Sequence, residues 1–184
     1  MGREQQAAGA ALERDLDAFH VNLSSQGWYV QRNHPKDRRT KGPPDYLAVG
    51  RVALRGSEGG EPASVLFDAK STRSPRWSLH LLKPHQAQAL DAFDKAGGVA
   101  GLYLRTTEGD AWIAWPDVRE RWRRWYASGK PDALTVGDGD RVLGCDYRHA
   151  VGCQRVYGTM KIPWDGDDFA AIEAHRARIG RRAP

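Results

Sequence analysis

Two strand-like segments separated by a short polar turn constrain the fold of this chain more than any other feature. Residues 45–54 alternate and are rich in valine and leucine, which is typical of a β-strand, and residues 64–70 predict the next strand. Residues 56–62, with the sequence GSEGGEP, predict a turn between them. The three segments together predict a β-hairpin.

Patterns on both sides of the hairpin extend this prediction to an α/β fold. Apolar residues recur at intervals of three and four from residue 4 to about residue 25, which predicts an amphipathic helix that Gly27 ends. Further helices are expected at residues 84–96, 116–128 and 167–179, and further strands at residues 28–31, 99–105 and 111–115. Residues 130–164 are rich in glycine and aspartate and predict no clear element. The order of elements predicts one central mixed β-sheet flanked by helices.

Length and composition fit a single globular domain. We expect residues 1–184 to form one domain, with a catalytic core at about residues 9–128 and a C-terminal extension at residues 129–184. Apolar residues at 40% and charged residues at 28% exclude a disordered chain. No apolar run approaches the roughly 18 residues of a membrane span, and no secretory signal is visible. We therefore expect a cytoplasmic protein without a membrane partner, in which Cys145 and Cys153 are reduced.

Positive charge is concentrated in three parts of the sequence. The formal net charge is +5 and the isoelectric point is about 9.4. The three clusters consist of Arg32, Lys36, Arg38, Arg39 and Lys41; of Arg119, Arg121, Arg123 and Arg124; and of Arg176, Arg178, Arg181 and Arg182. Separated basic patches of this kind favour a long anionic partner such as a nucleic acid.

The hairpin also carries a candidate site for chemistry. The period-two geometry of a strand sends Asp68 and Lys70 to the same face, and Asp45 begins the neighbouring strand. Two carboxylates can hold Mg²⁺, which prefers oxygen ligands, while an ammonium stabilises charge that develops at phosphorus. The trio therefore suits phosphodiester hydrolysis, although an Asp-x-Lys segment taken alone also fits a solvated ion pair on an exposed face.

The context of these residues resembles the core of the PD-(D/E)xK nucleases. Pro44-Asp45, an apolar strand, a tight turn and Phe67-Asp68-Ala69-Lys70 follow one another in the order found in that superfamily. More specifically, the chain resembles the RecU-type Holliday junction resolvases, and compact archaeal-type or phage resolvases compare as well. The segments that carry this resemblance are Gly9-Ala10-Ala11-Leu12-Glu13, Asp45-Tyr46 with Gly50, Asp68-Ala69-Lys70-Ser71-Thr72, His85-Gln86, and Gly97-Gly98-Val99-Ala100-Gly101-Leu102.

The resemblance covers residues 9–115 and implies a restriction-endonuclease-like core together with a set of site residues. Asp45 and Asp68 would bind the metal, with the Ala69 carbonyl as a further ligand, and Lys70 would be the catalytic lysine. Glu13 would complete the acidic site, and Gln86 would support it. For Glu13 a solvated helix position, and for Gln86 an ordinary polar position at a helix terminus, are equally good interpretations. His85 fits a structural role better than that of a general base.

The resemblance also implies a substrate and an assembly. The expected partner is branched DNA, the expected cofactor is Mg²⁺ with Mn²⁺ as a substitute, and no small-molecule cofactor is expected. A homodimer would match the two-fold symmetry of a four-way junction and make paired nicks. The residues expected to contact DNA are Arg32, Lys36, Arg38, Arg39, Lys41, Thr72, Arg73, Arg76 and Trp77. For the aromatic residues Trp112, Trp115, Trp122 and Trp125, core packing is favoured over base stacking.

Two departures from the resolvase pattern leave the substrate open. Asp68 stands where the RecU-type proteins usually have glutamate, and the basic loop at residues 34–44 replaces their long projecting segment. A restriction- or repair-type endonuclease that acts on duplex or flap DNA is one alternative. A DNA-binding module without hydrolysis is another, and it would require a broken site.

Overall fold

A twisted six-stranded β-sheet lies at the centre of the molecule. The structure is a computed structural model that describes residues 3–33, 43–52, 60–143 and 145–157. The strands lie in the order β1 (Tyr29–Arg32), β2 (Tyr46–Val52), β3 (Glu61–Ser71), β5 (Val99–Thr106), β6 (Gly109–Ala114) and β8 (Asp140–Val142). Neighbouring strands are antiparallel except β3 and β5, which are parallel, so the sheet is mixed.

The parallel pair follows from the connection between the two strands. The chain leaves β3, forms the short strand β4 (Trp77–Ser78) and a 3₁₀ turn at Leu79–Leu81, and then enters α2 (Pro84–Lys95) before β5. A crossover through a helix brings the next strand back in the same direction. Pro84 occupies the first turn of α2, where a missing backbone N–H costs nothing.

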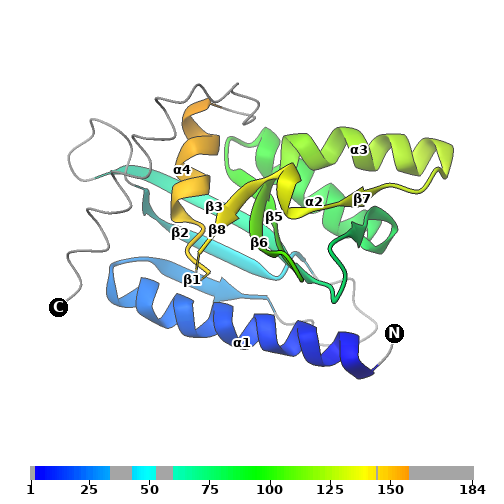
Figure 1. The fold of residues 1–184 in the computed structure, drawn as a ribbon. Coiled ribbons are helices and arrows are strands. Elements are labelled where there is room, and N and C mark those ends of the chain that lie inside the picture. The colour runs from blue at the N-terminus through cyan, green and yellow to red at the C-terminus, as the bar shows by residue number, and fades with distance from the viewer. Residues whose placement is uncertain (1–2, 34–42, 53–59, 144, 158–184) are drawn as a thin grey trace, which may run out of the picture.

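One face of the sheet is covered by α1 (Arg3–Ser25) and α4 (Arg148–Tyr157). Leucine side chains at intervals of four and seven along α1 are fully buried, and they pack with apolar residues of β2, β3 and α4. Figure 1 shows α1 running along one side of the sheet. The core on this face contains Leu12, Leu16 and Leu23, together with Tyr46, Phe67, Trp112, Tyr147 and Val151.

The opposite face is covered by α2 and α3 (Trp115–Ser128), which lie on the other side of the sheet from α1 in Figure 1. Their core is formed by Leu79, Leu90, Leu102, Leu104, Trp115 and Val118. A second, two-stranded sheet of β4 and β7 (Ala133–Leu134) extends this layer, and a 3₁₀ turn at Val136–Asp138 leads from it to β8. The result is a three-layer arrangement with a separate apolar core on each face of the sheet.

The predicted fold class is confirmed, and most predicted elements are present with ends shifted by a few residues. β3 begins before the predicted strand, because Glu61 and Pro62 already belong to it; residues 53–59 of the expected hairpin lie outside the described residues. Sequence patterns missed β4, β7, β8 and α4, which are short or lie in the glycine- and aspartate-rich segment. Both β8 and α4 come from the predicted extension, yet they join the central sheet and its core. The helix expected at residues 167–179 lies outside the described residues.

No helix within the described ranges is long and apolar enough to cross a membrane.

Candidate active site

The two aspartates and the lysine predicted from the hairpin come together at the end of β2 and β3. Asp45 directly precedes Tyr46, and Tyr46 pairs with Phe67, so the register places Asp45 beside Asp68. The backbone N–H of Ala69 donates a hydrogen bond of 2.9 Å to Oδ2 of Asp45. Nζ of Lys70 forms an ion pair with Oδ2 of Asp68. One lysine therefore faces two adjacent carboxyl groups.

The electrostatics of this pair are unfavourable for two full negative charges. Asp68 is completely buried, and Asp45 is half-buried. Burial, followed by the negative charge of Asp68, raises the pKa of Asp45 to about 7, against the opposing effect of Lys70. One lysine does not balance two carboxylates, so the pair lacks positive charge. Perturbed pKa values of this kind are common at functional sites.

Gln86 is held against Asp68 by the start of α2. Its Nε2 donates a hydrogen bond of 2.9 Å to Oδ1 of Asp68. Its Oε1 accepts a bond of 3.2 Å from the backbone N–H of Lys83, the residue that caps the helix. The amide is thus fixed at both ends, and the capping contact orients it so that its N–H₂ group points at the carboxylate.

Asn33 holds Asp45 from the other side, and sequence patterns did not identify it. The backbone N–H of Asn33 donates a hydrogen bond of 2.7 Å to the carbonyl of Asp45, and its Nδ2 donates one of 2.8 Å to the carbonyl of Pro44. Asn33 follows β1 directly, at the position that continues the alternation of Tyr29 and Gln31. This continuation of the strand pattern is the one signal that could have indicated it.

The donor set fits a hard divalent cation. Oδ2 of Asp68 is buried and accepts no hydrogen bond within the described residues; it has the ion pair with Lys70. Two carboxylates that converge suit Mg²⁺, which commonly takes one or two carboxylates and completes its coordination with water and substrate phosphate. Within the described ranges no group of three or more His, Cys, Asp or Glu residues could hold a metal ion. A cation here would depend on this pair.

Glu13 is not gathered with the two aspartates, contrary to the prediction that it completes the acidic group. Its carboxylate forms an ion pair with Arg32, which also pairs with Asp17. Arg32 lies over the ring of Tyr46, and Tyr46 donates a hydrogen bond of 3.1 Å to Asp17. This network ties α1 to the face of the sheet opposite Asp68, which explains the position of Glu13. A role for Glu13 through water stays a prediction.

The same network changes the interpretation of Arg32, which was expected to contact DNA. Its guanidinium is engaged by two carboxylates of α1, so Arg32 first of all joins α1 to β1. The remaining predicted contacts of this cluster, Lys36, Arg38, Arg39 and Lys41, lie outside the described residues.

The segment after β3 contains the other predicted DNA contacts. Thr72 ends the strand: its N–H donates to the carbonyl of Arg105 at 2.9 Å, and its Oγ1 accepts from the N–H of Ser74 at 3.2 Å. Arg73 and Arg76 are exposed, whereas His85 is half-buried. Trp77 is only 2% exposed and packs in the core with Leu79 and Leu134. The prediction that Trp77 contacts DNA is therefore wrong, because its ring is inaccessible.

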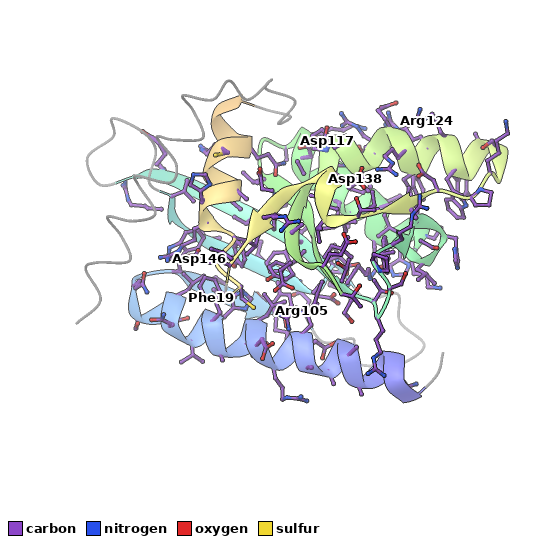
Figure 2. The ribbon with its side chains drawn as sticks, in the orientation of Figure 1. Phe19, Arg105, Asp117, Arg124, Asp138 and Asp146 are labelled. Carbon is purple, nitrogen blue, oxygen red and sulfur yellow. The ribbon has the colours of Figure 1, made fainter. Side chains whose placement is uncertain are left out.

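The basic cluster on α3 is largely neutralised by neighbouring acids. Arg119 pairs with Asp91 and Asp94 of α2, and Arg121 pairs with Asp132 and Asp138. Arg121 also donates to the carbonyl of Ala133 at 2.5 Å. Figure 2 shows Asp138 and Arg124 on this side of the molecule. These contacts attach α3 to its surroundings, so Arg119 and Arg121 serve packing rather than an open anion-binding patch, whereas Arg123 and Arg124 are exposed.

Two of the four tryptophans near α3 belong to the core, as the packing interpretation predicted. Trp112 and Trp115 are each 1% exposed. Nε1 of Trp112 donates a hydrogen bond of 2.9 Å to Gln154 of α4, and Nε1 of Trp115 donates one of 3.2 Å to Asp91. Trp122 also packs, partly buried, against the core beneath α3.

The comparisons with known proteins find similar solved structures but no match in sequence. No protein-family model matches the chain, and no curated protein matches it significantly in sequence. A similar solved structure is Hjc from Archaeoglobus fulgidus, described as a Holliday junction resolvase from an archaeal hyperthermophile. The two share 15% sequence identity and a TM-score of 0.45, over 72% of this chain and 94% of that one. At this identity and TM-score the likeness assigns no activity to the chain, and the case for one depends on the site itself.

Proposed function

We propose that the chain is a metal-dependent, structure-selective DNA endonuclease that resolves Holliday junctions by paired nicks. The observation that carries the proposal is the convergence of Asp45, Asp68 and Lys70 at the end of two adjoining strands. The sequence around these three residues resembles the PD-(D/E)xK nucleases, and segments outside it resemble the resolvases among them.

Each residue of the site has a separate proposed role in hydrolysis. Asp45 and Asp68 would bind Mg²⁺, or Mn²⁺ in its place; when bound, this ion polarises the phosphate and acidifies a water molecule. Lys70 presents a positive charge beside Asp68, where it can stabilise the charge that develops on the phosphate oxygens. Gln86 keeps Asp68 in one orientation through its hydrogen bond to Oδ1. A net charge of +5 favours the polyanionic substrate.

The preference for a junction and the dimer belong together in this proposal. Two nicks on opposing strands of a four-way junction require two sites related by a two-fold axis, and a homodimer supplies them. The resemblance of residues 9–115 to the resolvases supports this substrate over linear duplex DNA.

Cleavage of matched substrates by a matched pair of variants tests the proposal. Wild-type protein with Mg²⁺ should cut a synthetic four-way junction much faster than a linear duplex of the same sequence. Asp68→Asn should reduce the rate by about 10²-fold or more while junction binding in EDTA is retained, because the amide removes a metal ligand. Glu61→Gln, an exposed position on the same strand, is the control and should cut normally.

Three results would overturn parts of the proposal. Normal cutting by Asp68→Asn would exclude the site. Equal rates on duplex and junction would exclude the junction preference and leave a general endonuclease. Binding without any cutting by the wild-type protein, with Mg²⁺ or Mn²⁺, would leave a DNA-binding module.

A further inference from the structure

The face of β1 and β2 that leads away from the candidate site is open. Asp45, Leu47 and Val49 lie on one face of β2 because they alternate with the buried residues Tyr46 and Ala48. The register pairs Gln31 with Leu47, Tyr29 with Val49, and Ser64 with Val49 from the other side. These residues form two successive rows that start next to the Asp45–Asp68 pair. Over the four residues from Asp45 to Val49 the rows extend by roughly 13 Å.

Leu47, in the row next to the candidate site, is partly buried and packs against the core beneath α2 and α3, whereas the following row is more exposed. The helices α2 and α3 lie over β3, β5 and β6, where Leu66, Leu102 and Ile113 are buried beneath them. On β1 and β2, by contrast, the side chain of Tyr29 is 60% exposed and that of Val49 is 41% exposed. The same sheet face is therefore closed beside the candidate site on one side and accessible on the other.

A chain of hydrogen bonds links the exposed tyrosine to the site. The hydroxyl of Tyr29 donates to Oε1 of Gln31 at 3.1 Å, and Nε2 of Gln31 donates to Oδ1 of Asn33 at 3.2 Å. Nδ2 of Asn33 in turn donates to the carbonyl of Pro44 at 2.8 Å, next to Asp45. Each amide nitrogen carries two hydrogens, and one bond is shown from each, so both amides can also donate to a ligand on this face.

The charge of the open face differs from that of the face behind it. Its described residues on β1, β2 and the first half of β3 are neutral apart from Arg51, whose exposed guanidinium donates to the carbonyl of Gly60 at 2.7 Å. The α1 side of the sheet presents Glu13 and Asp17. An aromatic ring, amide donors and an arginine without carboxylates suit a polyanion with exposed bases, because stacking and phosphate contacts are the two contributions to single-strand binding.

From this combination we infer that the open face of β1 and β2 binds an unpaired stretch of the DNA strand that enters the candidate site. Tyr29 stacks on a base, with Val49 beside it, and the amides of Gln31 and Asn33 contact the backbone between that base and the scissile phosphate. The inference rests on the proposed nuclease function, and it names the part of the substrate that this chain recognises beyond the reacting phosphate.

The test measures DNA binding without cleavage. Anisotropy titrations in EDTA use the full-length protein, a fluorescent single strand and a four-way junction. Tyr29→Ala should weaken binding of the single strand about tenfold, the loss expected for one stacked base, while Tyr29→Phe should stay within twofold of wild type. Gln31→Ala should give a smaller loss with both probes. Tyr126→Ala, which removes a tyrosine that is 63% exposed on α3, is the control and should bind normally.

A base analogue locates the contact. A strand with 2-aminopurine at successive positions beside the cleavage point should lose fluorescence at one position with wild type and Tyr29→Phe, and at none with Tyr29→Ala. All four variants alter exposed side chains, so unchanged melting temperatures should accompany these results.

The outcomes separate this inference from the proposed function. Normal binding by Tyr29→Ala would overturn the inference even if the enzyme cuts junctions as proposed. If Tyr29→Ala changed the sedimentation mass but bound DNA normally, the face would serve contact between copies of the chain. This result would also overturn the inference. Weakened single-strand binding by Tyr29→Ala, together with quenching at one position by wild type and Tyr29→Phe, would support the inference even if no cleavage were found.

Discussion

At the scale of single residues, the candidate site is organised around one carboxyl pair that the protein holds in an unfavourable state. Asp45 and Asp68 are adjacent and poorly solvated, and Lys70 offsets part of their charge. This arrangement is costly without a ligand and favourable with a divalent cation, because the cation supplies the missing positive charge.

The raised pKa of Asp45 predicts an unusual dependence of stability on pH. Between pH 3.8 and about 7 the unfolded chain releases this proton while the folded chain keeps it, so the free energy of unfolding falls as pH rises through that window. Asp45→Asn removes the titration. In EDTA at pH 8 it should raise the free energy of unfolding by about 1–2 kcal/mol, as measured by urea denaturation at several pH values.

Addition of Mg²⁺ provides the control for this prediction. The cation should raise the melting temperature of the wild type, since it binds the folded state, and leave that of Asp45→Asn nearly unchanged. If Asp45→Asn were less stable than wild type at pH 8 in EDTA, the negative charges of Asp45 and Asp68 would not be unfavourable to the folded state, and the prediction would be contradicted.

The sequence predicted some residues of the candidate site from local patterns and others only by resemblance. Asp45, Asp68 and Lys70 follow from strand alternation and the hairpin, which are local patterns. Gln86 came from resemblance, and its contact with Asp68 depends on how α2 crosses the sheet. Glu13 was expected in the site and Arg32 on DNA. Sequence alone cannot show that the carboxylate of Glu13 and the guanidinium of Arg32 form an ion pair with each other.

At the scale of elements, α1 is attached to the sheet partly through a buried histidine. Nε2 of His20 lies 3.0 Å from the hydroxyl of Tyr147, and its ring contacts Tyr46 and Phe67 edge-on. Burial lowers the pKa of His20 to about 4, with Asp17 opposing the shift. His20 is therefore neutral where α1 meets the core.

Protonation of His20 should weaken this attachment in acid. The unfolded chain takes up the proton near pH 6.5 and the folded chain only near pH 4, so the contribution of neutral His20 is complete above pH 6.5 and is lost as pH falls through this window. We expect a loss on the order of 2 kcal/mol, measured as the difference between wild type and His20→Gln in chemical denaturation at pH 7 and pH 4, because Asp45 titrates in the same window in both proteins. His20→Gln should be less stable than wild type at pH 7 but lose less on acidification; an equal loss in both proteins would contradict the prediction.

Arg121 fastens α3 to the segment that leads to β8. Its guanidinium donates to both carboxylate oxygens of Asp132, at 2.6 and 3.0 Å, and to Asp138 at 2.6 Å. Lysine cannot reproduce this forked geometry, so Arg121→Lys should lower the free energy of unfolding by about 1–2 kcal/mol. Its DNA affinity should be unchanged.

The exposed Arg124 on the same helix provides the matched control, and Arg124→Lys should leave stability within about 0.5 kcal/mol of wild type. A loss of DNA affinity in Arg121→Lys with unchanged stability would restore the interpretation of α3 as a DNA-binding surface.

At the scale of the whole molecule, the two faces of the sheet have different tasks. The face beneath α1 and α4 is a core reinforced by ion pairs; for example, Arg105 reaches toward α1 and pairs with Asp15 there, as its position in Figure 2 illustrates. The other face carries Asp68 and Lys70, which Gln86 of α2 contacts through Asp68, with α2 and α3 on one side and the open rows of β1 and β2 on the other. The residues proposed for catalysis and for DNA binding thus share one side of the sheet.

The proposed homodimer predicts the behaviour of mixed assemblies. A dimer of one wild-type and one Asp68→Asn subunit, prepared with two different affinity tags, should nick one strand of a junction and fail to resolve it, because each nick needs its own intact site. Single-turnover gels under denaturing and native conditions distinguish nicked from resolved products. A wild-type dimer is the control, and complete resolution by the mixed dimer would contradict the paired-site proposal.

The sequence by itself determined the α/β fold class, most helices and strands, and the three residues that converge in the candidate site. These follow from local patterns, because the periodicity of apolar residues and the alternation along a strand act over a few neighbouring positions. Tertiary structure decided what those patterns cannot carry: that β8 and α4 complete the sheet and core, that Trp77 is buried, and that the arginines of α3 face acids. The physical reason is that burial and charge pairing depend on residues distant in sequence, which only the folded chain brings into contact.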